Sequence, residues 1–173
     1  TFVTNVVQAT TGGYTKVLLR RIWLFLFLAT VMVGLGGLVL QEADLSLMSM
    51  LLGLVLFAYA VLGFSGFYMR VAPERETMVG ASMGAVNGVL TGMVGSYAVP
   101  GVMYLQSLGL PRDQFVQAMG MLFLGSTIAL AVSLTSGNLM PANIGLASVL
   151  ATIPAYGGFF CGQRIRKQLS ENL

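Results

Sequence analysis

The sequence predicts an all-α integral membrane protein, and both composition and hydropathy support this fold class. Of the 173 residues, 56% are hydrophobic and only 9% are charged, whereas a soluble domain carries about 25% charged residues. The mean hydropathy is +0.84. The apolar residues fall in runs of about 20, the length that a helix needs to cross the hydrocarbon core of a bilayer. So few charges cannot cover so much apolar surface in water, which excludes the soluble classes.

Five runs are long enough to span the membrane, and one further run is too short. The five predicted spans are residues 22–40, 47–68, 78–95, 115–134 and 142–162. Residues 99–110 are apolar, but as a helix they cover roughly 18 Å, well below the core thickness of about 30 Å. Residues 2–10 read as the end of an earlier helix. We therefore expect about five full transmembrane helices plus a short broken or re-entrant helix.

The basic residues determine the predicted topology. They are Lys16, Arg20, Arg21, Arg70, Arg75, Arg112, Arg164, Arg166 and Lys167. All of them lie on one side of the membrane if the chain crosses and returns between Glu76 and Arg112. The positive-inside rule makes this side cytoplasmic, so residues 78–110 should form a hairpin with its apex near residues 95–101. Its short limb is either a tilted half-helix or a re-entrant segment.

A glycine at every fourth position marks the first limb of this hairpin, at Gly80, Gly84, Gly88 and Gly92. These glycines lie near one helix face, drifting about 40° per step because four residues overshoot a 3.6-residue turn. Small residues let transmembrane helices approach each other closely. We therefore interpret Gly80, Gly84 and Gly88 as helix-packing positions.

The helix should then stop, because Gly95, Ser96, Pro100 and Gly101 follow within a few residues. In lipid, a free backbone group is tolerated only where protein or a water-filled cavity satisfies it. A helix restarting near Pro100 would present unpaired N–H groups and a partial positive charge. The break is therefore predicted to bind a solute, through Gly92, Gly95, Ser96, Tyr97 and Pro100. A helix cap or an interfacial anchor is the alternative role of Ser96 and Tyr97, and close packing is that of Gly92 and Gly95.

No Asp, Glu, Lys or Arg lies inside a full predicted span, which argues against a carboxylate proton relay in this part of the protein. This absence favours an anion site made of backbone amides, helix N-termini and neutral polar side chains. The polar candidates for substrate binding are Asn87, Gln117, Asn5 and Gln8. Hydrogen bonding between helices is the alternative role of each. We interpret Ser126 and Thr127 as packing or backbone-bonding residues.

Cysteine and histidine content excludes several kinds of chemistry. Cys161 is the only cysteine, and histidine is absent, so an intramolecular disulfide and Ser-His or Cys-His catalysis are excluded. We expect no catalytic residue, no metal and no cofactor. The net charge of +3 is small and lies in the loops, so it bears on membrane orientation and not on nucleic-acid binding.

Two segments of the chain have the same predicted order of elements. Residues 1–40 and 117–166 each contain the end of a helix, a loop, and a span that finishes in clustered glycines. The charges orient the two segments oppositely, as in inverted-repeat transporters. The partner of the glycine-rich hairpin is then expected before Thr1. This interpretation divides the chain into the end of a first repeat (residues 1–68), a cytoplasmic linker (69–76) and a second repeat (77–173).

Several motifs follow one another in an order that resembles a known family. They are residues 88–101 (GVLTGMVGSYAVPG), 104–111 (YLQSLGLP), 117–120 (QAMG) and 162–166 (GQRIR). They resemble the second half of the sulfite exporter TauE/SafE family of membrane transporters. Residues 4–8 (TNVVQ) and 20–23 (RRIW) resemble the end of the first half of that family. The resemblance covers nearly the whole chain.

The resemblance implies a multi-pass carrier of small anions, often sulfur oxyanions or organosulfonates, in the bacterial plasma membrane. Many members have three glycines before the family proline, where this chain has Gly95, Ser96 and Tyr97. This departure bears on the substrate more than on the fold. The family's first glycine-rich hairpin and a final helix after Leu173 are absent from this sequence, so we expect the chain to be a fragment.

The combined prediction is a secondary transporter that moves small anions, such as sulfite, thiosulfate or organosulfonates, across the plasma membrane by alternating access. Its other expected partners are the lipid bilayer and a proton or sodium ion that couples transport. The alternative is an anion channel or a non-transporting membrane scaffold. A membrane enzyme is disfavoured because the chain has no histidine and no carboxylate inside its spans.

Overall fold

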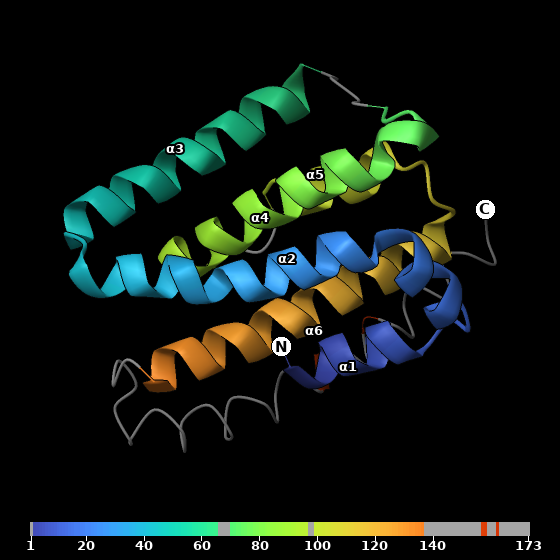
Figure 1. Ribbon diagram of the computed structural model, residues 1–173, viewed down its shortest axis with the longest axis horizontal. Coiled ribbons are helices and arrows are strands. Elements are labelled where there is room, and N and C mark those ends of the chain that lie inside the picture. Colours follow the sequence, from blue (N-terminus) through green and yellow to red (C-terminus); the bar gives the residue numbers. More distant parts are fainter. Residues whose placement is uncertain (1, 66–69, 97–98, 137–156, 159–161, 163–173) are drawn as a thin grey trace.

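The computed structural model describes residues 2–65, 70–96, 99–136, 157, 158 and 162, and every regular element in these ranges is a helix. The elements are α1 (Phe2–Thr10), α2 (Thr15–Glu42), α3 (Leu45–Phe64), the 3₁₀ turn η1 (Pro73–Arg75), α4 (Glu76–Val94), α5 (Gly101–Ser107) and α6 (Arg112–Ser136) (Figure 1). The predicted all-helical class is confirmed.

Four stretches of the described residues are long and apolar enough to cross a membrane. They are Thr15–Glu42, Ser46–Phe64, Pro73–Val94 and Arg112–Ser136. These stretches correspond to the first four predicted spans. The fifth predicted span, residues 142–162, lies outside the described residues except at 157, 158 and 162. The structure therefore supports a multi-pass membrane protein.

Local sequence explains several helix ends. The side chain of Asp44 accepts a hydrogen bond from the N–H of Ser46 at 2.9 Å, and so caps the start of α3. Carboxylates are favourable at this position because the first N–H groups of a helix have no partner within it. Pro73 opens the turn before α4, where a missing N–H costs nothing. Within α2, Ile22 departs from helical geometry (φ −118°, ψ 16°), so the helix is kinked directly after Arg21.

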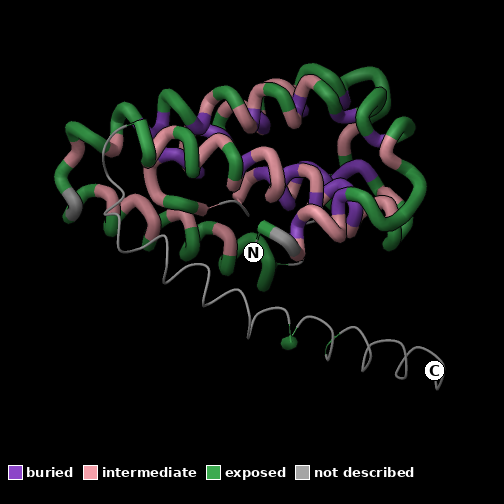
Figure 2. The backbone as a smooth tube through the Cα atoms, turned by 90° about the horizontal axis from the view of Figure 1, so that it is seen from below, coloured by how far each residue is buried: buried purple, intermediate pink, exposed green. Residues whose placement is uncertain are grey.

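α3 lies on the outside of the bundle, and none of its membrane-spanning stretch is buried. Phe57 and Phe64 on this helix are among the most exposed large apolar side chains of the described residues. Figure 2 shows the same contrast throughout, with buried positions between the central helices and exposed positions on the outer faces. Hydrocarbon tails are as apolar as leucine, so such a surface suits a lipid environment.

α2 lies at the centre of the described bundle, between α4 and α6 (Figure 1). The core around it includes Leu18, Ile22 and Phe25 of α2, with Tyr104 of α5 and Leu122 of α6. The rings of Phe25 and Tyr104 pack with their centroids 4.6 Å apart. The short helix α5 is therefore anchored to the central helix by an aromatic pair.

The predicted glycine face of α4 packs against α2. A Cβ added at Gly84 would lie 2.5 Å from the backbone oxygen of Phe25, and one at Gly88 would lie 2.7 Å from that of Ala29. Gly92 meets the oxygen of Val33 in the same way. Each step of four residues along α4 is matched by a step of four residues in the same direction along α2. The two helices therefore run parallel, with their backbones in contact.

Gly80 has a different neighbour from the other three glycines. A Cβ added there would lie 2.5 Å from the hydroxyl oxygen of Tyr104, so this position admits the tyrosine of α5. All four glycines of this face, Gly80, Gly84, Gly88 and Gly92, therefore lie at close contacts with neighbouring helices.

α5 runs back along α4. Its first residue, Gly101, donates its N–H to the side chain of Asn87, and the Tyr104 hydroxyl donates to the backbone oxygen of Glu76 at 3.0 Å. α4 and α5 therefore form a hairpin at the place where the charge pattern predicts one. The returning limb contains a seven-residue helix.

The basic residues of the described chain gather at one end of the bundle. A Cβ added at Gly125 would lie 2.7 Å from the hydroxyl of Thr30, and Gly37 meets Ser133, so α6 is also parallel to α2. The first turns of α2, α4 and α6 therefore share one end (Figure 1, right). At or just before these turns are Lys16, Arg20, Arg21, Arg70, Arg75 and Arg112. The other three basic residues lie outside the described residues.

Candidate functional site

α4 ends at Gly95, which has a left-handed backbone (φ 70°) and donates its N–H to the oxygen of Thr91 at 2.9 Å. Glycine adopts this conformation without the steric cost that a Cβ carries. The hydroxyl of Thr91 then donates to the backbone oxygen of Ser96 at 2.9 Å. Thr91 is fully buried, so it holds the first residues of the break against the helix that they have just left. Tyr97 lies outside the described residues.

The returning chain meets Asn87, two turns back from the end of α4. The N–H of Gly101 donates to Asn87 Oδ1 at 2.9 Å, and Pro100 occupies the N-cap position of α5. Asn87 is seven residues before Val94, or about 10 Å along the helix. The break therefore turns back into the bundle, and α5 begins about halfway along α4.

The amide nitrogen of Asn87 has no hydrogen-bond partner, although the side chain is 0% exposed. Leaving a buried donor unpaired costs about 1–3 kcal/mol. The side-chain oxygen of Asn87 therefore accepts the hydrogen bond at the start of α5, while its two amide N–H bonds remain available inside the protein.

Three more buried polar atoms of the described residues lack a partner: Asn5 Nδ2, Ser126 Oγ and Thr127 Oγ1. Gly88 and Gly125 meet neighbouring residues of α2, Ala29 and Thr30. Asn87 and Ser126, which flank these two glycines, therefore lie at nearly the same depth in the bundle.

Asn5 approaches this depth from α1. A Cβ added at Gly120 would lie 2.6 Å from the backbone nitrogen of Ala9 and 2.7 Å from Gln8 Cβ, so α1 packs closely on α6. The two helices are antiparallel, because Gly120 meets Gln8 whereas Gln117, earlier on α6, meets Ala9 and Gly12, later in the chain. Asn5 lies one turn before Ala9, which brings it towards the middle of α6. Gln8 is only partly buried and belongs to this α1–α6 contact.

Gln117 is fully engaged in hydrogen bonds. Its Nε2 donates to the backbone oxygen of Ala9 at 2.9 Å and to the hydroxyl of Thr15 at 3.0 Å, and its Oε1 accepts from the N–H of Tyr14 at 3.2 Å. An amide nitrogen has two N–H bonds, and both are used here. Gln117 therefore joins α6 to the turn between α1 and α2, and has no free donor for a solute.

A second polar cluster, which the pattern of residues does not predict, lies at the basic end of the bundle. Arg21 binds Glu76 through Nε at 2.8 Å and through a terminal nitrogen at 2.6 Å, and also donates to the backbone oxygen of Leu108 at 3.3 Å. With the Tyr104–Glu76 bond, this cluster joins α2, α4 and the end of α5. The signal in the sequence was Glu76, a carboxylate at the first position of a span, at the end of the bundle where the basic residues gather.

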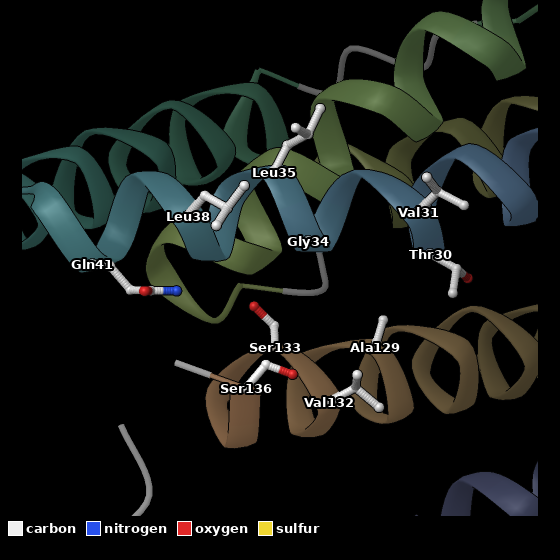
Figure 3. Close-up of a pocket in the computed structure, with 10 residues that line it drawn as sticks. All are labelled: Thr30, Val31, Gly34, Leu35, Leu38, Gln41, Ala129, Val132, Ser133 and Ser136. Atoms are coloured by element: carbon white, nitrogen blue, oxygen red, sulfur yellow. The ribbon is translucent and has the colours of Figure 1, made fainter. Parts of the chain in front are cut away.

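A groove of about 580 Å³ lies between α2 and α6, away from the break (Figure 3). Its lining residues are Thr30, Val31, Gly34, Leu35, Leu38, Gln41, Ala129, Val132, Ser133 and Ser136. The lining is mostly apolar, and the hydroxyl of Thr30 is bonded to its own helix at Leu26. None of the predicted site residues lines this groove.

The structure thus places Gly95 and Ser96 at the end of α4, beside Thr91. Pro100 lies about two turns back, next to Gly101 and its partner Asn87. Gly92 faces α2. A Cβ added at Gly101 would lie 2.7 Å from Asn87 Oδ1 and 2.9 Å from Leu122 Cδ2, so α6 closes this region from the other side. Gln117 and Gln8 lie elsewhere, at the α1–α6 contact. Among the described residues, no group of His, Cys, Asp and Glu could hold a metal ion.

Comparison with curated proteins and with solved structures finds no match. The family profile of the sulfite exporter TauE/SafE matches residues 1–173, in agreement with the resemblance carried by the motifs around the break. The chain therefore belongs to the sulfite exporter TauE/SafE family, a family of membrane transporters of sulfite or related anions.

Proposed function

We propose that this chain is part of a secondary transporter that moves small anions, such as sulfite, thiosulfate or organosulfonates, across the plasma membrane by alternating access. The observation that carries the proposal is the free amide of Asn87, buried beside a break in the α4–α5 hairpin. Unpaired donors inside a membrane protein are costly, and an anion is the ligand that satisfies them. The coupling ion is a proton or a sodium ion.

The predicted site residues divide into two roles in this proposal. Asn87, Asn5, Ser96 and Tyr97 contact the anion, while Gly95 and Pro100 set the path of the break. Gly92 packs α4 against α2 just before the break. Gln117 and Gln8 hold α1 on α6, because the donors of Gln117 are already engaged. The residues that do not contact the anion act by holding the helices that carry the contacting residues in position.

We also propose the repeat organisation, with residues 1–68 ending one repeat and residues 77–173 forming the next. Opposed repeats commonly place broken helices near the midplane of the membrane, and α5 begins about halfway along α4. The close packing of α2 on α4 makes these two parts one packed unit in space. In this topology the basic end of the bundle faces the cytoplasm.

Counterflow in proteoliposomes tests the transporter proposal with the full-length protein that contains this chain. Vesicles loaded with unlabelled sulfite should accumulate labelled sulfite transiently, which a channel or a scaffold does not do. Thiosulfate and methanesulfonate are tested in the same way. Absence of counterflow for all three anions would contradict the proposal.

Gly95→Leu tests the site. We expect this variant to insert into the membrane and to lose transport, because a side chain would fill the break and would strain the backbone. Gly109→Leu is the matched control, since Gly109 also has a positive φ (60°) and no atom within 4 Å of an added Cβ. It lies at the far end of α5, so its transport should persist. Normal transport by Gly95→Leu would refute the assignment.

A further inference from the structure

We infer that Ser126 of α6 completes the anion site with Asn87, and that this uncharged set of donors accepts singly charged oxyanions in preference to doubly charged ones. The inference rests on the proposed function, because it assigns the substrate class of the same site.

Ser126 faces the region of the break. Leu122, one turn earlier on α6, lies against Gly101, the residue that bonds to Asn87, and residues four apart share one face of a helix. Ser126 is 0% exposed, and its hydroxyl has no partner. A serine in a membrane helix commonly bonds to its own backbone, as Ser82 does with Met78 on α4. Ser126 does not, so its O–H is free to bind a ligand.

The unpaired donors that the described residues place at this depth are all neutral. They are the amides of Asn87 and Asn5 and the hydroxyls of Ser126 and Thr127. The sequence contains no Asp, Glu, Lys or Arg in residues 22–41, 77–111 and 114–163. This chain therefore offers hydrogen bonds to a buried anion but no opposite charge.

The charged and titratable side chains of the helices around the site lie away from it. α2 carries Lys16, Arg20, Arg21 and Glu42 at its ends, α4 begins with Glu76, α5 holds Tyr104, and α6 begins with Arg112 and Asp113. The nearest ion pair, Arg21 with Glu76, is internally neutral. Glu76 lies eleven residues before Asn87, about 16 Å along α4. Tyr104 directs its hydroxyl towards that same end, at Glu76.

The charge of the ligand then decides whether it can enter. The desolvation free energy of an ion grows with the square of its charge. A dianion therefore costs about four times as much to move out of water as a monoanion of the same size. A few neutral hydrogen bonds offset the smaller cost far better than the larger one. Hydrogensulfite and alkanesulfonates therefore bind this site more tightly than the dianions do. Among the anions of the proposed function, thiosulfate and the sulfite dianion are the weaker ligands, and sulfate is disfavoured in the same way.

Equilibrium binding to the purified full-length protein in detergent tests the inference with three probes. Methanesulfonate is a monoanion and sulfate a dianion throughout the neutral pH range, whereas sulfite passes from one form to the other. We expect methanesulfonate to bind equally well from pH 6 to pH 8.5 and sulfate to bind at least about tenfold more weakly. The apparent affinity for sulfite should fall by about tenfold per pH unit once the dianion dominates, because only the competent fraction binds.

Two results separate this inference from the proposed function. If sulfate binds as well as methanesulfonate, or if sulfite binding does not change with pH, the preference for monoanions is wrong and the anion site remains. If none of the three probes binds at any pH, both the inference and the anion site are wrong.

Ser126→Ala tests the part assigned to Ser126. It should weaken methanesulfonate binding by about tenfold, the usual effect of losing one hydrogen bond to a charged group. The melting temperature without ligand should stay the same or rise, because a buried unpaired hydroxyl is removed. An unchanged affinity would show that Ser126 lies outside the site.

Ser107→Ala is the matched control for Ser126→Ala. Ser107 is also buried, but its hydroxyl donates to the backbone oxygen of Tyr104 at 2.6 Å. This variant should lower the melting temperature and leave the affinity for methanesulfonate unchanged. A loss of affinity in both variants would mean that Ser126→Ala acts through the fold, which would also overturn the assignment.

Discussion

Arg21 of α2 and Glu76 of α4 form a two-point ion pair, with N–O distances of 2.8 and 2.6 Å. The two residues are 55 positions apart in the sequence, and they lie where the parallel helices α2 and α4 both begin. Arg21 also reaches Leu108 at the end of α5. The pair therefore fixes three helix ends at the basic end of the bundle.

Breaking this pair should destabilise the protein. We expect Glu76→Gln to lower the stability by about 1–2 kcal/mol, because the planar guanidinium loses a charged partner of matching geometry. The effect is modest since 38% of the Arg21 side chain is exposed and water screens exposed charges. Thermal unfolding in detergent measures it. Arg20→Gln, at the exposed neighbour, is the control and should have little effect.

Adding a methyl group to the glycine face of α4 should separate α4 from α2. Gly84→Ala places a Cβ about 2.5 Å from a backbone oxygen of Phe25, and overpacking of this kind costs about 1–3 kcal/mol or more. A lower melting temperature and a smaller folded yield are the expected results.

Gly53→Ala is the matched control for Gly84→Ala, because Gly53 lies on the exposed face of α3 with no atom within 4 Å of an added Cβ. It should stabilise the protein by about 0.5–1 kcal/mol, the usual preference for alanine in a helix. Equal effects of the two changes would show that α4 does not depend on close contact.

Gln117→Ala should affect stability and leave anion binding intact. The change removes three hydrogen bonds that join α6 to the turn between α1 and α2. At about 1 kcal/mol for each bond, we expect a loss of about 2–3 kcal/mol. Gln106→Ala, at an exposed position of α5, should be nearly neutral. If Gln117→Ala keeps its melting temperature but loses methanesulfonate binding, Gln117 contacts the anion directly.

Asn87→Asp should separate the two functions of Asn87. The carboxylate keeps an oxygen that accepts from Gly101, but it has no N–H and it repels an anion. We expect methanesulfonate binding to disappear at neutral pH, while Asn87→Leu, which also loses the bond to Gly101, should unfold at a lower temperature than Asn87→Asp. Retained binding in Asn87→Asp would contradict the anion site.

The hairpin and its glycine face could be predicted because both depend on patterns along the chain. Basic residues flank the segment from Glu76 to Arg112 on both sides, and this alone requires the chain to return. The four-residue spacing of Gly84, Gly88 and Gly92 likewise defines one helix face. The charge pattern left the form of the returning limb open, and the structure makes it a short helix that begins at Gly101.

The partners of these residues could not be predicted, because they are backbone atoms or distant residues. The glycines of α4 meet backbone oxygens of α2. Every residue has a backbone oxygen, so the amino-acid types along α2 do not indicate where this contact lies. Gln117 bonds to residues more than 100 positions away. From the sequence, Ser126 is predicted to be a packing residue, since a helical serine commonly bonds to its own helix. The structure is needed to show that its hydroxyl has no partner.

The backbone contact between α2 and α4 also limits how this protein can move. Three successive glycines of α4 fit against backbone oxygens of α2, so sliding one helix along the other would push a side chain into a backbone atom. The two helices therefore act as one rigid body. Single hydrogen bonds, from Thr91 to Ser96 and from Gly101 to Asn87, hold the break to that body. A movement of α5 away from that body must therefore break at least the bond from Gly101 to Asn87 and the bond from Tyr104 to Glu76.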